Sequence, residues 1–168
     1  TAWGLHGAIH KLCSHAKCIM HVHSIYATTL SSMDECVLPP INQVASIFFN
    51  RQVVDKNYGG LAFEEEGRRC AGLLSDPNKH TFIMGNHGIL IFGKNVAETF
   101  NRLFYFERAA KIYVQALQTG KTLSILDDVI AEKTAQELEN EEYPKPAGTA
   151  FLREIKLILD QEKSDYSQ

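Results

Sequence analysis

The chain has 168 residues, of which 45% are hydrophobic and 22% charged, and its formal net charge is −3. This length allows one domain with a substantial hydrophobic core but is too short for two ordinary domains. A slightly acidic chain without a basic run lacks the electrostatic signature of nucleic-acid binding, and no apolar stretch approaches the roughly 20 residues of a membrane helix.

The first predicted element is a helix over residues 1–13, with Thr1 as a candidate N-cap. The apolar residues that share one stripe of it are Leu5, Ala8, Ile9 and Leu12. Because the chain enters this helix at once, we expect residue 1 to lie inside a larger domain. His6 and His10 stand at i, i+4, a spacing that can bind metal, but the companion Glu of an HExxH motif is absent. A half-buried or solvated role is therefore the default for both.

Residues 17–23 predict a buried strand that carries two histidines. Alternate side chains of a strand point to the same face, so His21 and His23 project together while Val22 packs the other way. One further histidine would complete a three-nitrogen metal site with an open coordination position, which is typical of catalytic rather than structural zinc. The alternative is a chance His-x-His pair in an edge strand.

His87 is the natural third ligand. It lies in a tight connection, flanked by Gly85 and Gly88, between the predicted strands 81–84 and 89–92. We therefore expect a β-hairpin whose turn presents an imidazole.

The segment between the two histidine motifs alternates short helices and strands. Ser24 is the expected N-cap of a helix over residues 25–33, and an acidic run opens another helix at Glu64. A solvated first turn explains that acidic run better than a metal site. The remaining expected elements are an extended break at 38–41, weak helix at 42–49, a strand at 52–55, a turn at 58–60 and helix to residue 74.

The longest predicted helix follows the hairpin. Asn95 and Glu98 form a candidate capping box at its start, and Gly120 is a candidate stop. Glu107 falls on the apolar stripe of this helix, where a carboxylate must be paired or hydrogen-bonded. We expect it to support the structure or the metal site rather than to catalyse directly.

The C-terminal part is expected to be helical. An acidic helix over 124–142, a linker over 143–148 and an amphipathic helix over 149–162 are predicted, the last docking on this chain or on a neighbour. We therefore divide the chain into a domain over 1–122 and a helical extension over 123–168. Strands interleaved with helices indicate an α/β sandwich with a mixed or largely antiparallel sheet.

Several separated motifs stand in a characteristic order: His21-Val22-His23-Ser24-x-Tyr26-Ala27-Thr28, Leu38-Pro39-Pro40, Tyr58-Gly59-Gly60, Glu65-Glu66-Gly67, Asn86-His87-Gly88 and Glu107-Arg108-Ala109. Together they resemble the class II aldolase/adducin superfamily, in its bacterial adducin-like branch. The similarity covers about residues 1–120. It implies a three-layer α/β/α sandwich with a central, mostly antiparallel sheet, commonly assembled as a tetramer with active sites between subunits.

The resemblance also implies a chemistry. Zinc, or another divalent transition metal, would be held by His21, His23 and His87. The metal would polarise the carbonyl of a carbohydrate-like or keto-acid substrate and stabilise the enediolate left when a carbon–carbon bond breaks, by aldol cleavage or decarboxylation. A homo-oligomer, with neither nucleic acid nor membrane as partner, is expected.

Two positions depart from the aldolase pattern. Where the aldolases carry a proton-transferring Glu and a Tyr acid, this chain has Ala2 and Gln43. Another acid or base is then needed, and Tyr26, Glu65 and Glu66 are the catalytic candidates, with Glu107 or a residue of an adjacent subunit as alternatives. The competing hypothesis is a non-catalytic adducin-head-like module for oligomerisation or protein interaction.

Cysteine usage bears on the compartment. The four cysteines form no CxxC pair and no dense framework: Cys13, Cys18, Cys36 and Cys70. Reduced thiols of a cytoplasmic protein explain this pattern better than a secreted disulfide scaffold.

Overall fold

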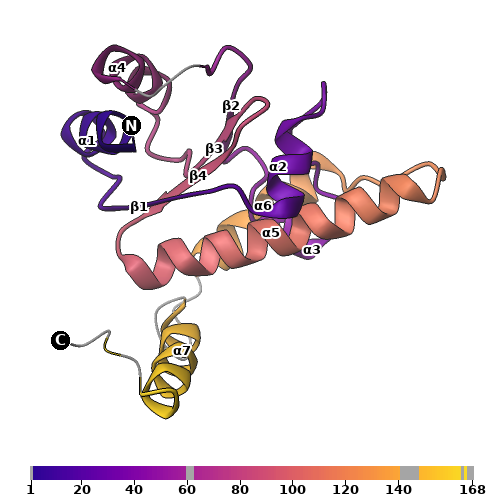
Figure 1. The fold of residues 1–168 in the computed structure, drawn as a ribbon. Coiled ribbons are helices and arrows are strands. Elements are labelled where there is room, and N and C mark those ends of the chain that lie inside the picture. Colours follow the sequence, from indigo (N-terminus) through magenta and orange to yellow (C-terminus); the bar gives the residue numbers. More distant parts are fainter. Residues whose placement is uncertain (1, 60–62, 141–147, 164, 166–168) are drawn as a thin grey trace.

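The computed structural model describes residues 2–59, 63–140, 148–163 and 165. A four-stranded sheet in the order β1-β4-β3-β2 stands at its centre (Figure 1). These strands are β1 (Cys18–Val22), β2 (Gln52–Asp55), β3 (Thr81–Met84) and β4 (Gly88–Gly93). β4 pairs antiparallel with both β1 and β3, whereas β2 runs parallel to β3. The expected α/β fold with a mixed, largely antiparallel sheet is confirmed.

Helices cover both faces of the sheet because its central strands are buried on both sides. In β4, Leu90 and Phe92 pack towards α1 (Ala2–Leu12) and α4 (Glu64–Leu73), as strand alternation requires. Ile89 and Ile91 face the opposite core, which α2 (Ile25–Ser31), α3 (Gln43–Ser46) and α5 (Val96–Gln118) complete. The result is the expected three-layer arrangement.

The helix boundaries follow the capping signals. Asn95 is the N-cap of α5, and its side chain accepts a hydrogen bond of 2.9 Å from the amide of Glu98. Gly120, just beyond the end of α5, adopts the left-handed conformation with φ of +67°. Thr1, Gly60 and residues 143–147 of the predicted linker lie outside the described residues, so the expectations placed on them stay predictions.

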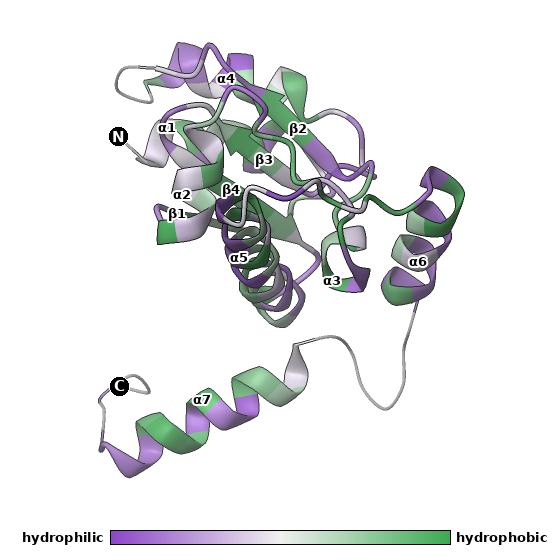
Figure 2. Ribbon diagram, turned by 90° about the vertical axis from the view of Figure 1, so that its right-hand side faces the viewer, coloured by the Kyte–Doolittle hydropathy of each residue, from purple (hydrophilic) through white to green (hydrophobic). Residues whose placement is uncertain are grey.

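The C-terminal extension consists of α6 (Asp128–Asn140) and α7 (Thr149–Gln161). α7 touches α5 near its start, where the Phe151 ring lies 4.7 Å from that of Phe104, and the rest projects away from the domain (Figure 2). None of the described helices is both long and apolar enough to cross a bilayer.

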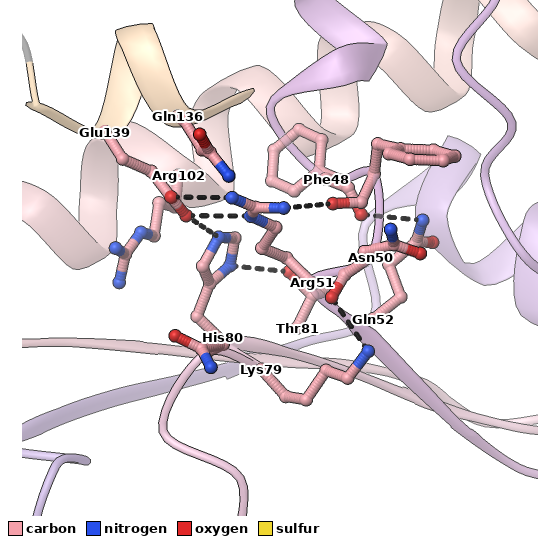
Figure 3. A network of polar contacts seen from close by, with 12 residues as sticks. Phe48, Asn50, Arg51, Gln52, Lys79, His80, Thr81, Arg102, Gln136 and Glu139 are labelled. Carbon is pink, nitrogen blue, oxygen red and sulfur yellow. Dashed lines mark hydrogen bonds and ion pairs between the residues drawn. The ribbon is translucent and has the colours of Figure 1, made fainter. Parts of the chain in front are cut away.

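A buried arginine joins α6 to the sheet layer (Figure 3). Arg51 is only 6% exposed, and its guanidinium donates to Glu139 at 3.0 and 2.9 Å and to Glu132 at 2.6 Å. Buried His80 places Nε2 3.7 Å from Oε1 of Glu139. Because a buried charge needs a partner, this network determines where α6 packs.

The network predicts loss of stability in acid. Burial lowers the pKa of His80 from 6.5 to about 4. Burial acts to raise the pKa of Glu139, but its contacts with His80 and Arg51 outweigh that effect and lower it to about 2. Both pKa values are depressed by folding, so the unfolded chain binds more protons, and both contributions to stability are present at neutral pH. We expect the free energy of unfolding to fall from pH 6.5 towards 4 through His80, and further below pH 4.5 through Glu139.

Urea unfolding at pH 7, 5.5 and 4.5 measures this dependence. His80→Gln is the matched variant, because it removes the titrating imidazole and should flatten the decrease between pH 6.5 and 4. An equal slope in the variant and the wild-type protein would contradict the assignment to His80.

Candidate metal centre

Two neighbouring parts of the sheet bring three histidines together. His21 and His23 come from the end of β1, and His87 comes from the turn between β3 and β4. β1 pairs with β4 so that Val22 opposes Ile89, which places the end of β1 beside that turn. The three Nε2 atoms converge, with separations of 3.0 Å for His21–His23 and 3.2 Å for both His21–His87 and His23–His87.

These separations fit a single metal ion. Zinc bonded to imidazole nitrogens at about 2.0–2.1 Å in a tetrahedron places two such nitrogens roughly 3.3 Å apart. Three nitrogens leave one tetrahedral position for a substrate oxygen or water. The donor set and its geometry therefore suit a divalent ion of the kind the resemblance implies.

Hydrogen bonding prepares His21 as a ligand. Its Nδ1 lies 2.8 Å from the carbonyl oxygen of Ile89, so Nδ1 carries the proton and Nε2 presents its lone pair. Burial lowers the pKa of His21, the bond to Ile89 opposes this effect, and the charge of His23 adds to it. Burial, followed by the charges of His21 and His23, also lowers the pKa of His87. Lowered pKa values favour the neutral imidazoles that bind metal.

The turn must approach β1 closely to bring His87 in. A Cβ atom at Gly88 would lie 2.7 Å from the carbonyl oxygen of Val22 and 2.9 Å from Cδ2 of His23. Only glycine leaves this space free. Asn86 takes the left-handed conformation, with φ of 55°, that closes the turn.

The ring of Tyr58 lies beside the centre, 4.7 Å from that of His87. The only signal for this contact in the sequence was the Tyr58-Gly59-Gly60 motif. His6, for which a half-buried or solvated role was expected, has its pKa lowered first by burial and then by the charges of His21 and His10.

None of the three catalytic candidates belongs to the histidine group. Among the described residues, the histidine group contains no carboxylate within metal-ligand range. Glu65 is exposed on α4, and Glu66 accepts bonds of 2.8 and 2.7 Å from Arg69, which lowers its pKa. Tyr26 packs against the core on the α5 side of the sheet, whereas His21 points with Leu90 to the α1 side.

A second cluster of possible ligands does not suit a metal. Asp55, Glu66 and Cys70 lie within ligand distance of one another. However, the guanidinium of Arg69 binds both carboxylates. Burial raises the pKa of the Cys70 thiol to about 12, so it stays protonated. This cluster is a structural ion pair on the α4 side.

Glu107 is satisfied as the sequence requires of a carboxylate on an apolar stripe. It accepts hydrogen bonds from the hydroxyl of Ser24 at 2.7 Å and from the amides of Tyr26 and Ala27 at 3.0 and 2.9 Å. Ser24 occupies the predicted N-cap position of α2 but makes no capping bond with its own side chain.

Comparisons with known proteins agree with this architecture. Residues 1–114 match the Class II Aldolase and Adducin N-terminal domain. The chain is 31% identical to mouse gamma-adducin over 117 residues, which are 70% of this chain and 16% of that protein. It is 30% identical over 124 residues to a putative aldolase class 2 protein of Pseudomonas aeruginosa, covering 73% of this chain and 46% of the relative.

Solved structures show the same fold. An aldolase II superfamily protein from Pseudomonas syringae superposes with a TM-score of 0.83 at 23% identity, over 99% of this chain and 65% of that one. L-fuculose 1-phosphate aldolase from Glaciozyma antarctica gives a TM-score of 0.76 at 21% identity, over 96% and 60%. The chain thus spans less than half of the two sequence relatives and under two thirds of both structures.

Proposed function

The chain belongs to the class II aldolase and adducin N-terminal domain family, and on that premise we propose that it is a zinc-dependent lyase that breaks a carbon–carbon bond in a small oxygenated substrate. The observation that carries this proposal is the convergence of the three Nε2 atoms of His21, His23 and His87 to within 3.2 Å of one another. A pure scaffold has no chemical reason to bring three imidazole nitrogens to one point.

The three histidine side chains would hold and orient a divalent ion, and the ion would supply the electrophile. A divalent ion held by His21, His23 and His87 would supply a Lewis acid able to polarise a carbonyl oxygen. Imidazole ligands suit zinc among the available metals, although they also suit copper, iron and nickel. The open position and the carbonyl-polarising role favour a carbohydrate-like or keto-acid substrate, cleaved by retro-aldol chemistry or decarboxylation.

The absence of an acid–base residue at positions 2 and 43 favours a homo-oligomer. Ala2 cannot transfer a proton, and Gln43 is exposed on α3. General acid–base catalysis contributes about 10²–10⁴ in rate, so an enzyme of this kind needs a replacement. We propose a homo-oligomer, such as a tetramer, in which a neighbouring subunit brings an acid or base to the three histidines. The four cysteines are free thiols, which supports a cytoplasmic location.

Turnover tests the proposal. Zinc-loaded protein would be assayed with L-fuculose 1-phosphate, other sugar phosphates and hydroxy-keto acids, beside His87→Ala as the control. We expect cleavage of at least one compound at a rate that the variant reduces at least about a hundredfold, in line with loss of the electrophile. Equal rates for the two proteins across the whole panel would contradict a lyase.

A second candidate function is a non-catalytic oligomerisation module like the adducin head. The departures at Ala2 and Gln43 favour it, as does α7, in which no residue is buried. The half-exposed Leu157 and Ile158 of α7 offer apolar surface to a partner. Sedimentation equilibrium at micromolar concentration tests the module, which a strictly monomeric protein would contradict. Because the lyase is also proposed to be a homo-oligomer, the turnover assay separates the two functions.

A further inference from the structure

Glu107 lies on α5, but its carboxylate accepts hydrogen bonds from the start of α2. The hydroxyl of Ser24 and the amides of Tyr26 and Ala27 all donate to it, across about 80 positions of chain. These donors form the entry to α2 and come directly after His23. Glu107 of α5 therefore determines the position of the start of α2, the segment that follows His23.

This arrangement is a helix cap supplied by another part of the chain. The first amides of a helix have no intrahelical acceptor, and a side-chain oxygen of the N-cap residue commonly satisfies one. Ser24 makes no such bond, and the carboxylate of Glu107 accepts from the amides of Tyr26 and Ala27 in its place. A negative carboxylate at the positive end of the α2 dipole is also favourable. The three bonds thus tie the start of α2 to α5.

His23 depends on this tie more than His21 does. His21 is held by its Nδ1 bond to Ile89, whereas within the described chain the His23 ring hydrogen-bonds only towards His21 and His87. His23 is also exposed. Its position therefore comes from its backbone, which lies between β1 and the entry to α2.

We propose that Glu107 is a positioning residue for the metal centre, acting through the entry to α2 on His23. This inference rests on the three-histidine metal centre proposed above. Outer partners that orient metal ligands typically contribute 10–100-fold to metal affinity, and Glu107 holds the main chain next to a ligand rather than its ring.

Glu107→Gln tests the role with little change of shape. The glutamine amide brings a donor towards three donors, so at least one bond is lost. We expect the Kd for Co²⁺, measured from its d–d absorption during titration, to rise about 10–100-fold. Ser24→Ala removes one of the three bonds and should raise it by a smaller factor. In the metal-free Glu107→Gln protein, the amides of Tyr26 and Ala27 should exchange with solvent faster than in the wild-type protein.

Asn95→Ala is the matched control, because it removes the N-cap of the same helix, α5, whereas Glu107 lies in the middle of that helix. It should weaken the fold but change the Kd for Co²⁺ by less than about twofold, since it touches no group near the histidines. A rise in the Kd of Glu107→Gln no larger than that of Asn95→Ala would overturn the role of Glu107 alone, as would unchanged exchange at Tyr26 and Ala27. A wild-type protein that binds no Co²⁺ would overturn the metal centre itself, and this role with it.

Discussion

Replacing His87 by alanine is expected to abolish tight zinc binding. The variant retains two of the three converging imidazoles, His21 and His23, and opens a second coordination position to water. We expect a loss of affinity above the 10–100-fold that removal of an outer partner costs, so that purified protein changes from near-stoichiometric zinc to almost none. His21→Ala should behave alike. Plasma mass spectrometry of protein purified without an affinity tag measures the metal content.

Thermal unfolding supplies a second readout of the same loss. Zinc at a hundredfold excess over its Kd stabilises a folded protein by about 2.7 kcal/mol if the unfolded chain does not bind it. This gain should vanish in His87→Ala. His10→Ala is the matched control, because His10 lies on α1 outside the cluster and bonds instead to the carbonyl oxygen of Ala16 at 2.9 Å. Metal-free wild-type protein that takes up no added zinc would contradict the three-histidine centre.

Arg51→Met is expected to cause the largest loss of stability. It leaves the carboxylates of Glu132 and Glu139, whose side chains are only 31% and 29% exposed, without their buried cation. Breaking a buried ion pair from one side costs about 3–5 kcal/mol, and the partial exposure of both acids places this variant near the lower end. Urea unfolding at pH 7 measures the change.

An exposed ion pair on α6, the helix that carries Glu132 and Glu139, provides the control. Lys133 and Glu137 lie 3.7 Å apart with side chains 74% and 67% exposed, so Lys133→Ala should shift the free energy of unfolding by less than about 0.5 kcal/mol. If Arg51→Met were no more destabilising than Lys133→Ala, the network would not anchor α6.

Local signals in the sequence determined much of the secondary structure. The predicted strand over 52–55 coincides with β2, and the predicted helix over 64–74 ends one residue beyond α4. Alternation along β1 placed His21 and His23 on one face, and Gly88 marked a turn that β1 approaches closely. Such features could be read because the periodicity of a strand and the geometry of a turn are written in neighbouring residues.

Tertiary structure alone decided the partnerships across the chain. Glu107 needed a partner by its position on an apolar stripe, but nothing nearby in sequence identified the α2 amides. Arg51 and Glu139 are 88 positions apart, and their pairing follows from how α6 packs. The same holds for Asp55, whose carboxylate binds Arg69 from 14 positions away in the sequence.

The histidine centre shows which features the sequence determined and which the tertiary structure decided. Residue type and local spacing nominated His21, His23 and His87, because each lies at a strand end or a tight turn that sequence patterns reveal. Their convergence at 3.0–3.2 Å required the pairing of β1 with β4, a contact between segments about 70 positions apart. Sequence alone thus determined which imidazoles could bind a metal. Packing of the sheet decided that they meet, because only folding brings distant strands into register.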